Sequence, residues 1–126
     1  MKHGILQYTV SIVALSLCAA AYAAPEVSYN NAVRPILHDY CLNCHEQGGM
    51  GLAKSGLDMS SYQSLMKGTK FGAVIKPGDS FTSIFIQVIE GRVHPSIKMP
   101  YGMAGGLSKH NIDILKRWVD QGAKDN

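Results

Sequence analysis

One short motif constrains this chain more than any other feature of its 126 residues. Two cysteines three positions apart are followed at once by a histidine, in the order Cys41-Leu42-Asn43-Cys44-His45. Thiols about one helical turn apart can reach two neighbouring vinyl groups of a porphyrin, and the adjacent histidine is then brought under the iron. The pattern is typical of c-type haem attachment. We therefore expect one haem c per chain, held by thioethers from Cys41 and Cys44, with His45 as the proximal iron ligand.

Three other uses of a C-x-x-C pair compete with haem attachment. A dithiol redox motif normally follows a strand in a βαβ unit, and no such unit is predicted here. A zinc site would need its second half from scattered histidines such as His94 and His110, without another close pair. A structural disulfide would leave His45 without a role. Haem attachment explains all three residues together.

The first 23 residues have the pattern of an export signal. A basic start at Lys2 precedes an apolar run that is densest over residues 10–20, and an Ala-Tyr-Ala sequence ends at Ala23. The dense run is much shorter than the roughly 20 residues that cross a bilayer. We predict a cleaved signal peptide at 1–23, a mature domain at 24–126 and a periplasmic or otherwise exported protein without a membrane span. A retained anchor and lipid attachment at Cys18 are the alternatives.

The charge of the mature segment is small. With Lys2 removed, the 12 basic residues become 11 against 9 acidic ones, a formal charge of +2. There is no basic block and no acidic tail, so nothing indicates nucleic-acid binding or strong electrostatic docking to a membrane. We expect redox partner proteins, with the chain acting as a monomer or as a subunit of a redox complex.

Apolar spacing and glycine stops predict four helices and no strand pair. The helical stripes cover residues 33–41, 60–67, 81–90 and 108–121. The third has Phe81 and Ile84 on its apolar face and stops at Gly91, and the fourth has Ser108 as its N-cap and Gly122 as its left-handed terminator. Glycine-rich loops are expected between them, including residues 48–51. The predicted fold class is all-α, with about four helices around one covalently bound haem.

The second axial ligand of the iron has several candidates among the methionines and histidines. Met99 lies in a segment expected to be non-helical, Ile97 to Gly102, and Pro100 after it keeps the backbone extended. A thioether held in such a loop can be kept against an iron. We therefore expect Met99 as the distal ligand, with Met103 or His94 as alternatives and an open or water-bound position as a further one.

Several stretches occur in an order that resembles a known family. They are Val33-Arg34-Pro35-Ile36-Leu37, Cys41 to His45, Gly56-Leu57-Asp58, Pro77-Gly78-Asp79-Ser80, Lys98-Met99-Pro100, Leu107-Ser108 and Arg117 through Ala123. Together they resemble class I cytochromes c, and most closely the planctomycete-type cytochrome c domain. The resemblance implies a compact helical fold, His/Met ligation through Met99, and electron transfer without chemistry on a substrate. The sequence departs from the family at Tyr101, where a second proline is common.

We therefore expect an exported single-electron carrier and not an enzyme. Trp118 and Tyr101 are expected to pack beside the haem or to donate hydrogen bonds to a propionate, and Trp118 as an ordinary helix-packing residue is an equal alternative. Two other functions stay open. One is a gas-binding or peroxide-reactive haem protein with an open or displaceable sixth ligand, and the other is a fixed electron-feeding subunit of a larger enzyme complex.

Overall fold

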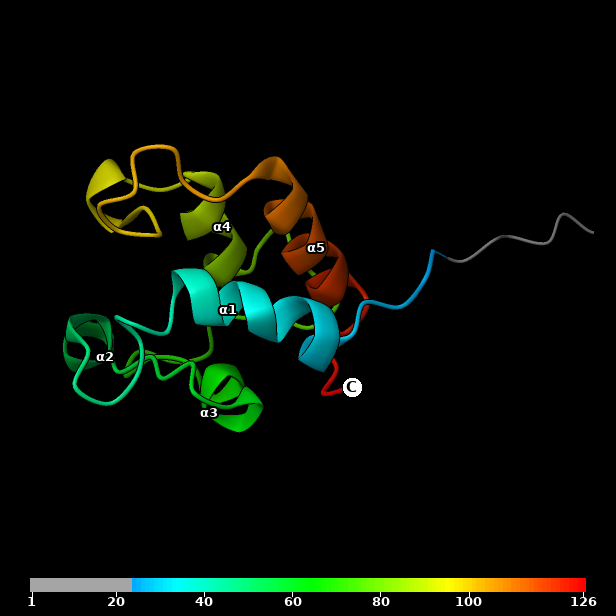
Figure 1. Cartoon of the computed structure of the whole chain (residues 1–126), viewed down its shortest axis with the longest axis horizontal. Coiled ribbons are helices and arrows are strands. Elements are labelled where there is room, and N and C mark those ends of the chain that lie inside the picture. Colours follow the sequence, from blue (N-terminus) through cyan, green and yellow to red (C-terminus); the bar gives the residue numbers. More distant parts are fainter. Residues whose placement is uncertain (1–23) are drawn as a thin grey trace, which may run out of the picture.

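The computed structural model describes residues 24–126, and the expected signal peptide at 1–23 lies outside the described residues. Within them, five α-helices and two short turns of other helix types follow one another. The elements are η1 (Tyr29–Val33, a π-helix), α1 (Arg34–Tyr40), α2 (Met50–Ser55), α3 (Tyr62–Lys67), α4 (Ile84–Glu90), η2 (Pro95–Ile97, a 3₁₀ turn) and α5 (Lys109–Asp120). The described chain has no strand, and its isolated bridge joins Thr69 to Gly72. The all-α prediction is confirmed (Figure 1).

None of the helices in this part of the chain is long and apolar enough to span a membrane.

Serine hydroxyls cap two of the helices, and the cap at Ser108 is the one that the sequence predicts. The Ser61 hydroxyl accepts a hydrogen bond from the Ser64 backbone N–H at 3.1 Å, which completes a capping box at the start of α3. The Ser108 hydroxyl accepts from the Asn111 N–H at 3.2 Å at the start of α5. After α5 the chain turns through Gly122, whose φ of 103° is a backbone conformation that glycine adopts without strain. These local signals therefore set the predicted boundaries of the second and fourth helices.

The third helix starts later than its apolar spacing predicts. Asp79 accepts a hydrogen bond from the Thr82 N–H at 2.9 Å, and the Ser83 hydroxyl donates to the Asp79 carbonyl at 2.7 Å. These side-chain bonds hold residues 79–83 in a turn, so α4 begins at Ile84. As a result Phe81 is 73 % exposed and lies outside the helix, with the Arg92 guanidinium 4.9 Å from the centre of its ring. Ile84 is also exposed, and the face expected to be buried is shifted.

The glycine-rich stretch after the motif is partly helical, not a plain loop. Residues 50–55 form α2, with Gly49 as N-cap and Gly56 as a left-handed C-cap at φ 77°. Sequence spacing did not predict this helix because it has no apolar stripe: none of its residues is buried. It is held by backbone contacts with the motif instead. The fold therefore has five α-helices where four were predicted.

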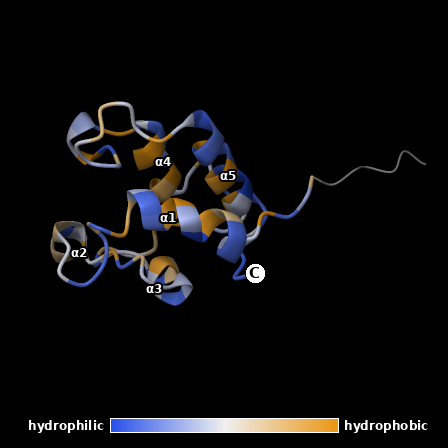
Figure 2. Ribbon diagram, in the orientation of Figure 1, coloured by the Kyte–Doolittle hydropathy of each residue, from blue (hydrophilic) through white to orange (hydrophobic). Residues whose placement is uncertain are grey.

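The hydrophobic core lies where α1, α4 and α5 meet, and Figure 2 shows their apolar segments gathered there. Helix α5 contacts both α4 and η1. The largest fully buried side chains are Trp118, Leu37, Leu65, Ile86, Leu115, Val33 and Val119. Because these side chains come from η1, α1, α3, α4 and α5, one core holds these elements together.

The beginning and end of the described chain are tied together at one end of the molecule, opposite α2 (Figure 1). The Val27 N–H donates to the Gln121 side-chain oxygen at 2.7 Å, and the Asn30 N–H donates to the Asn126 carbonyl at 3.0 Å. The motif segment and the loop after η2 lie at the other end. The fold therefore keeps the candidate site apart from both ends of the described chain.

Candidate functional site

The cysteine motif continues the path of α1 as a further helical turn. The Cys41 N–H donates to the Leu37 carbonyl at 2.9 Å, and the His45 N–H donates to the Cys41 carbonyl at 3.0 Å. Cys41 is half-buried, whereas Cys44 is exposed, and both thiols are free. The two sulfurs therefore stand about one turn apart on adjacent sides of one backbone coil, as the sequence predicts.

Burial changes the chemistry of the first thiol. It raises the pKa of Cys41 to about 11, and the neighbouring Cys44 adds to the increase. A redox-active dithiol needs at least one thiol whose pKa is lowered, because the thiolate is the reactive form. Cys41 therefore stays protonated at neutral pH and is not the reactive thiol of such a pair. The described residues also contain no group of three His, Cys, Asp or Glu side chains that could hold a metal ion, which leaves the zinc alternative unsupported.

His45 is buried and its ring is oriented by the backbone. Its Nδ1 lies 3.1 Å from the Leu57 carbonyl oxygen. Because a carbonyl oxygen only accepts hydrogen bonds, Nδ1 must carry the proton and the lone pair stays on Nε2. A hydrogen bond of this kind fixes the tautomer and the orientation of metal-binding histidines. His45 is therefore prepared to bind a metal through Nε2.

Two glycines let α2 lie directly against the motif. A side chain at Gly49 would place its Cβ 2.3 Å from the Cys44 carbonyl oxygen. A Cβ at Gly51 would lie 2.8 Å from Cε1 and 2.9 Å from Nε2 of His45. The Leu52 N–H uses this close approach to donate to the Cys44 carbonyl at 2.9 Å. Gly49 and Gly51 therefore allow the backbone of α2 to lie close to the motif, where any side chain would clash.

The chain after α2 returns to the motif and enters the core. The Met59 N–H donates to the His45 carbonyl at 2.8 Å, and the Met59 side chain is 6 % exposed within the hydrophobic core. Leu57, whose carbonyl accepts from His45, is also buried. His45 is thus fixed through both its backbone and its ring.

Met99 lies in irregular backbone after η2, at the same end of the molecule as the motif (Figure 1). Ile97 belongs to η2, so the non-helical segment starts one residue later than predicted. The Met99 N–H donates to the Val88 carbonyl at 3.0 Å, which anchors the loop to α4. Its side chain is half-buried against the core. Met99 is therefore held by a fixed backbone while part of its thioether side chain stays accessible.

The alternative ligands are less restrained than Met99. Met103 is 41 % exposed in the glycine-rich part of the same loop. His94 is exposed and caps η2, because its Nδ1 lies 2.8 Å from the Ser96 hydroxyl and accepts from the Ser96 N–H. Tyr101 is 77 % exposed. None of these three side chains packs against the core of the described protein.

Trp118 is buried and its polar group has a partner within the protein. The indole N–H donates to the Lys124 carbonyl at 2.9 Å. Its ring lies 5.6 Å from that of Tyr29, which in turn contacts the Tyr62 ring at 5.2 Å. These contacts occupy the indole N–H that a propionate would need and favour the helix-packing alternative for Trp118.

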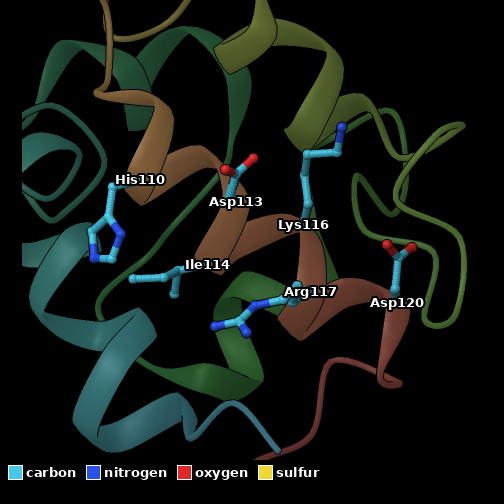
Figure 3. A pocket seen from close by; sticks show the side chains of 6 residues that line it. All are labelled: His110, Asp113, Ile114, Lys116, Arg117 and Asp120. Atoms are coloured by element: carbon cyan, nitrogen blue, oxygen red, sulfur yellow. The ribbon is translucent and has the colours of Figure 1, made fainter. Parts of the chain in front are cut away.

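A shallow hollow runs along one side of α5 (Figure 3). Its lining side chains are His110, Asp113, Ile114, Lys116, Arg117 and Asp120. Asp113 pairs with Lys109, and Lys116 pairs with Glu90 of α4, each at 2.6 Å. Acidic and basic side chains both line the hollow, and these two pair with residues outside its lining, so the hollow is a solvated helix face.

The donor set at the motif end fits a covalently bound haem. The motif turn carries two free thiols for thioethers and an imidazole whose Nδ1 is bonded to the Leu57 carbonyl, and the loop after η2, which carries the Met99 thioether, lies at the same end of the molecule (Figure 1). The same end carries the exposed apolar side chains of Met50 and Ile97 on α2 and η2, two elements that bury no residue of their own. A large flat apolar group would cover such side chains.

Some residues of the site were not predicted from the sequence. Gly51 and the Leu57 carbonyl act through backbone contacts, and Ser55 acts through a hydroxyl that bonds to the backbone of Gly51 and Leu57, so none of the three belongs to an apolar side-chain pattern. The one available signal was the cluster of glycines at 48–51, since glycine often marks close backbone approach.

Comparison with known proteins gives one family. Residues 41–100 match the family model described as Planctomycete cytochrome C. Neither the curated proteins nor the solved structures gave a match to the chain. The matched segment starts at Cys41 and ends at Pro100, so it contains the motif, α2 and Met99. A domain of this family implies haem c attached through the two cysteines. Residues 41–100 are therefore similar to the planctomycete-type cytochrome c domain.

Proposed function

We propose that this protein is an exported carrier of single electrons, in which Cys41 and Cys44 hold one haem c and His45 and Met99 are its axial ligands. When bound, the haem supplies the one-electron Fe(III)/Fe(II) couple. The observation that carries the proposal is the orientation of His45: its Nδ1–H is committed to the Leu57 carbonyl, and its Nε2 is free for a metal.

The hydrogen bond from His45 to Leu57 has a chemical effect beyond orientation. Donation from Nδ1–H increases the electron density of the imidazole, so the ring becomes a stronger ligand through Nε2. A Met99 thioether is a soft ligand that favours Fe(II). The strong imidazole ligand His45 and the soft thioether ligand Met99 would therefore have opposing effects on the two oxidation states. Together they would fill both axial positions of the iron, which suits electron transfer and not binding of a substrate.

The backbone restraints on both ligands support the same role. Electron transfer is rapid when little moves between the two oxidation states, which requires ligands that are fixed beforehand. His45 is held at its N–H, its carbonyl and its ring, and Met99 is held to α4 through Val88. The protein thus contributes a pre-arranged ligand set.

Export and partners are part of the proposal. Haem c attachment to reduced thiols outside the cytoplasm agrees with the signal-peptide pattern of residues 1–23. The small net charge favours recognition of protein redox partners through local contacts.

The test is a spectrum of the purified holoprotein together with a redox titration. We expect a reversible one-electron couple, the weak far-red band of methionine ligation in the ferric form, and no rapid binding of carbon monoxide to the ferrous form. A ferric spectrum without that band, combined with ready carbon monoxide binding, would replace the carrier by the gas-binding or peroxide-reactive alternative. N-terminal sequencing of the mature protein should start at Ala24, and an intact Met1 would contradict export by cleavage.

A pull-down of the native holoprotein distinguishes a free carrier from a fixed subunit. A free carrier should be recovered alone at physiological ionic strength, whereas a stoichiometric enzyme complex would establish the subunit role.

A further inference from the structure

The Ser55 hydroxyl joins the two backbone points that contact the ring of His45. It donates a hydrogen bond to the Gly51 carbonyl at 2.7 Å and accepts one from the Leu57 N–H at 3.1 Å. Gly51 lies beside the Cε1 and Nε2 atoms of the ring, and the Leu57 carbonyl accepts from its Nδ1. The Ser55 side chain therefore connects the two backbone positions, Gly51 and Leu57, that contact the His45 ring.

We propose that Ser55 and Gly51 are positioning residues that set the orientation, and through it the ligand strength, of His45. The inference rests on the proposed function, because it takes His45 as the iron ligand. Ser55 acts by holding α2 and the Leu57 backbone at a fixed separation. Gly51 acts by having no side chain where the ring lies.

Ser55 has the properties of a structural clamp. It is the last residue of α2 and is partly buried. A serine hydroxyl in a helix often bonds to the carbonyl four residues earlier, as Ser55 does with Gly51. The second bond of Ser55 is unusual because its partner, the Leu57 N–H, lies beyond the end of the helix. Removal of the hydroxyl leaves the Leu57 N–H without its acceptor. The Leu57 carbonyl is then freer to move away from His45.

Gly51 occupies a helical position at which helix propensity would favour another residue. It lies in the first turn of α2 with an ordinary helical backbone, because its φ is not among the positive ones. Alanine is the better helix former at such a position. The atoms that a Cβ would meet are the Cys44 carbonyl oxygen and the ring of His45, all closer than 3 Å. Absence of a side chain therefore serves the imidazole and not the helix.

The first experiment compares Ser55→Ala with Ser55→Thr in the holoprotein. In Ser55→Ala, a weaker Nδ1–H bond makes the imidazole a poorer donor to Fe(III), so the reduction potential should rise. The Nδ1 proton of the ferrous protein, followed by NMR, should exchange with solvent about fivefold to tenfold faster, since one hydrogen bond is weakened. Ser55→Thr keeps the hydroxyl and should restore both values.

The matched control is Ser61→Ala, which removes a serine hydroxyl of another helix. Ser61 caps α3 through bonds to Ser64 alone, so its loss should lower stability while the potential and the proton exchange stay parental.

The second experiment replaces Gly51 by Ala and compares it with Gly105→Ala and Ala53→Gly. A Cβ at Gly105 has no heavy atom within 4 Å, and Ala53 is exposed on the same helix as Gly51. Gly51→Ala should shift the potential and the ferric spectrum, and both controls should leave them unchanged. If Gly51→Ala accumulates no holoprotein, the Ser55 pair decides the question.

Parental potential and parental Nδ1 exchange in Ser55→Ala, with only the stability loss seen in Ser61→Ala, would overturn the positioning role. That outcome differs from failure of the proposed function, which would appear in the parent protein as the absence of a reversible one-electron couple.

Discussion

The end of the molecule that holds the two termini differs from the end that holds the cysteine motif in what its side chains pack against. At the terminal end, Trp118, Tyr29 and Tyr62 pack on one another with ring centres 5.2–5.6 Å apart, and Trp118 is 1 % exposed. At the motif end, α2 and η2 bury no side chain, and Met50 is 66 % exposed. Side chains are therefore packed against one another at the terminal end, whereas at the motif end the side chains of α2 and η2 are not buried.

The difference is one of interaction type. Packing of apolar side chains fixes the terminal end, whereas backbone hydrogen bonds to Cys44, His45 and Leu57 fix the motif end. Those bonds orient His45 but bury little apolar surface, and the haem of the proposed function would supply the apolar partner that the motif end lacks. A variant at the terminal end should therefore change stability, and one at the motif end should change haem chemistry.

The largest expected effect is that of His45→Ala at the motif end. Without the proximal imidazole, covalently attached haem loses one axial ligand, and we expect no stable six-coordinate holoprotein. The measurement is the yield and visible spectrum of exported haem protein. His110→Ala, on the exposed face of α5, is the control and should give the parental yield. Normal yield of a six-coordinate protein from His45→Ala would contradict the ligand assignment.

Trp118→Ala tests the terminal end. The variant removes a fully buried indole, its contact with Tyr29 and its hydrogen bond to Lys124, so we expect a loss of about 3–5 kcal/mol in the free energy of unfolding. Urea unfolding of the holoprotein measures it. Trp118→Phe should lose less. The haem spectrum and potential should stay parental in both variants, and a clear shift would show that Trp118 acts on the haem.

Met99→Ala changes one ligand at the motif end and leaves the attachment intact. The covalent holoprotein should accumulate, because Cys41, Cys44 and His45 remain. The far-red band should disappear and the reduction potential should fall, since the thioether favours Fe(II). Met103→Ala is the matched control, four residues further along the same loop. If the band survives in Met99→Ala and is lost in Met103→Ala, the ligand is Met103.

The terminal end was largely predictable from the sequence, and the motif end only in part. The spacing of Leu115, Trp118 and Val119 predicts a buried helix face, and all three are buried. Cys41, Cys44 and His45 follow from the chemistry of haem attachment and occur on the turn that the motif predicts. Apolar periodicity and the haem-attachment motif are both local patterns of side chains, and such patterns can be recognised in a single sequence.

The remainder could not be predicted because it depends on backbone contacts or on competing local bonds. Helix α2 has no apolar stripe, and the acceptor for His45 is a main-chain carbonyl that any residue would supply. Phe81 fits the helical spacing, but the bonds from Thr82 and Ser83 to Asp79 place it in a turn. Trp118 suits a haem contact by residue type, and its partner at Lys124 lies beyond the helix end.

The smallest effect concerns the ion pair between Glu90 of α4 and Lys116 of α5 at 2.6 Å. Burial acts to raise the pKa of Glu90, but hydrogen bonds from Lys116 and Arg92 outweigh it and hold the pKa below its ordinary value of 4.5. A carboxylate with a lowered folded-state pKa stabilises the fold above its unfolded pKa, and the contribution is lost as the pH falls through the folded value. Glu90→Gln should therefore cost about 0.3–1 kcal/mol in unfolding free energy at pH 7. The difference from the parent should shrink as the pH falls below about 4.5, because the carboxylate of the unfolded parent chain is protonated there before that of the folded protein. Urea unfolding at both pH values measures it, and a difference that stays constant with pH would show that Glu90 stabilises the fold by packing and not by charge.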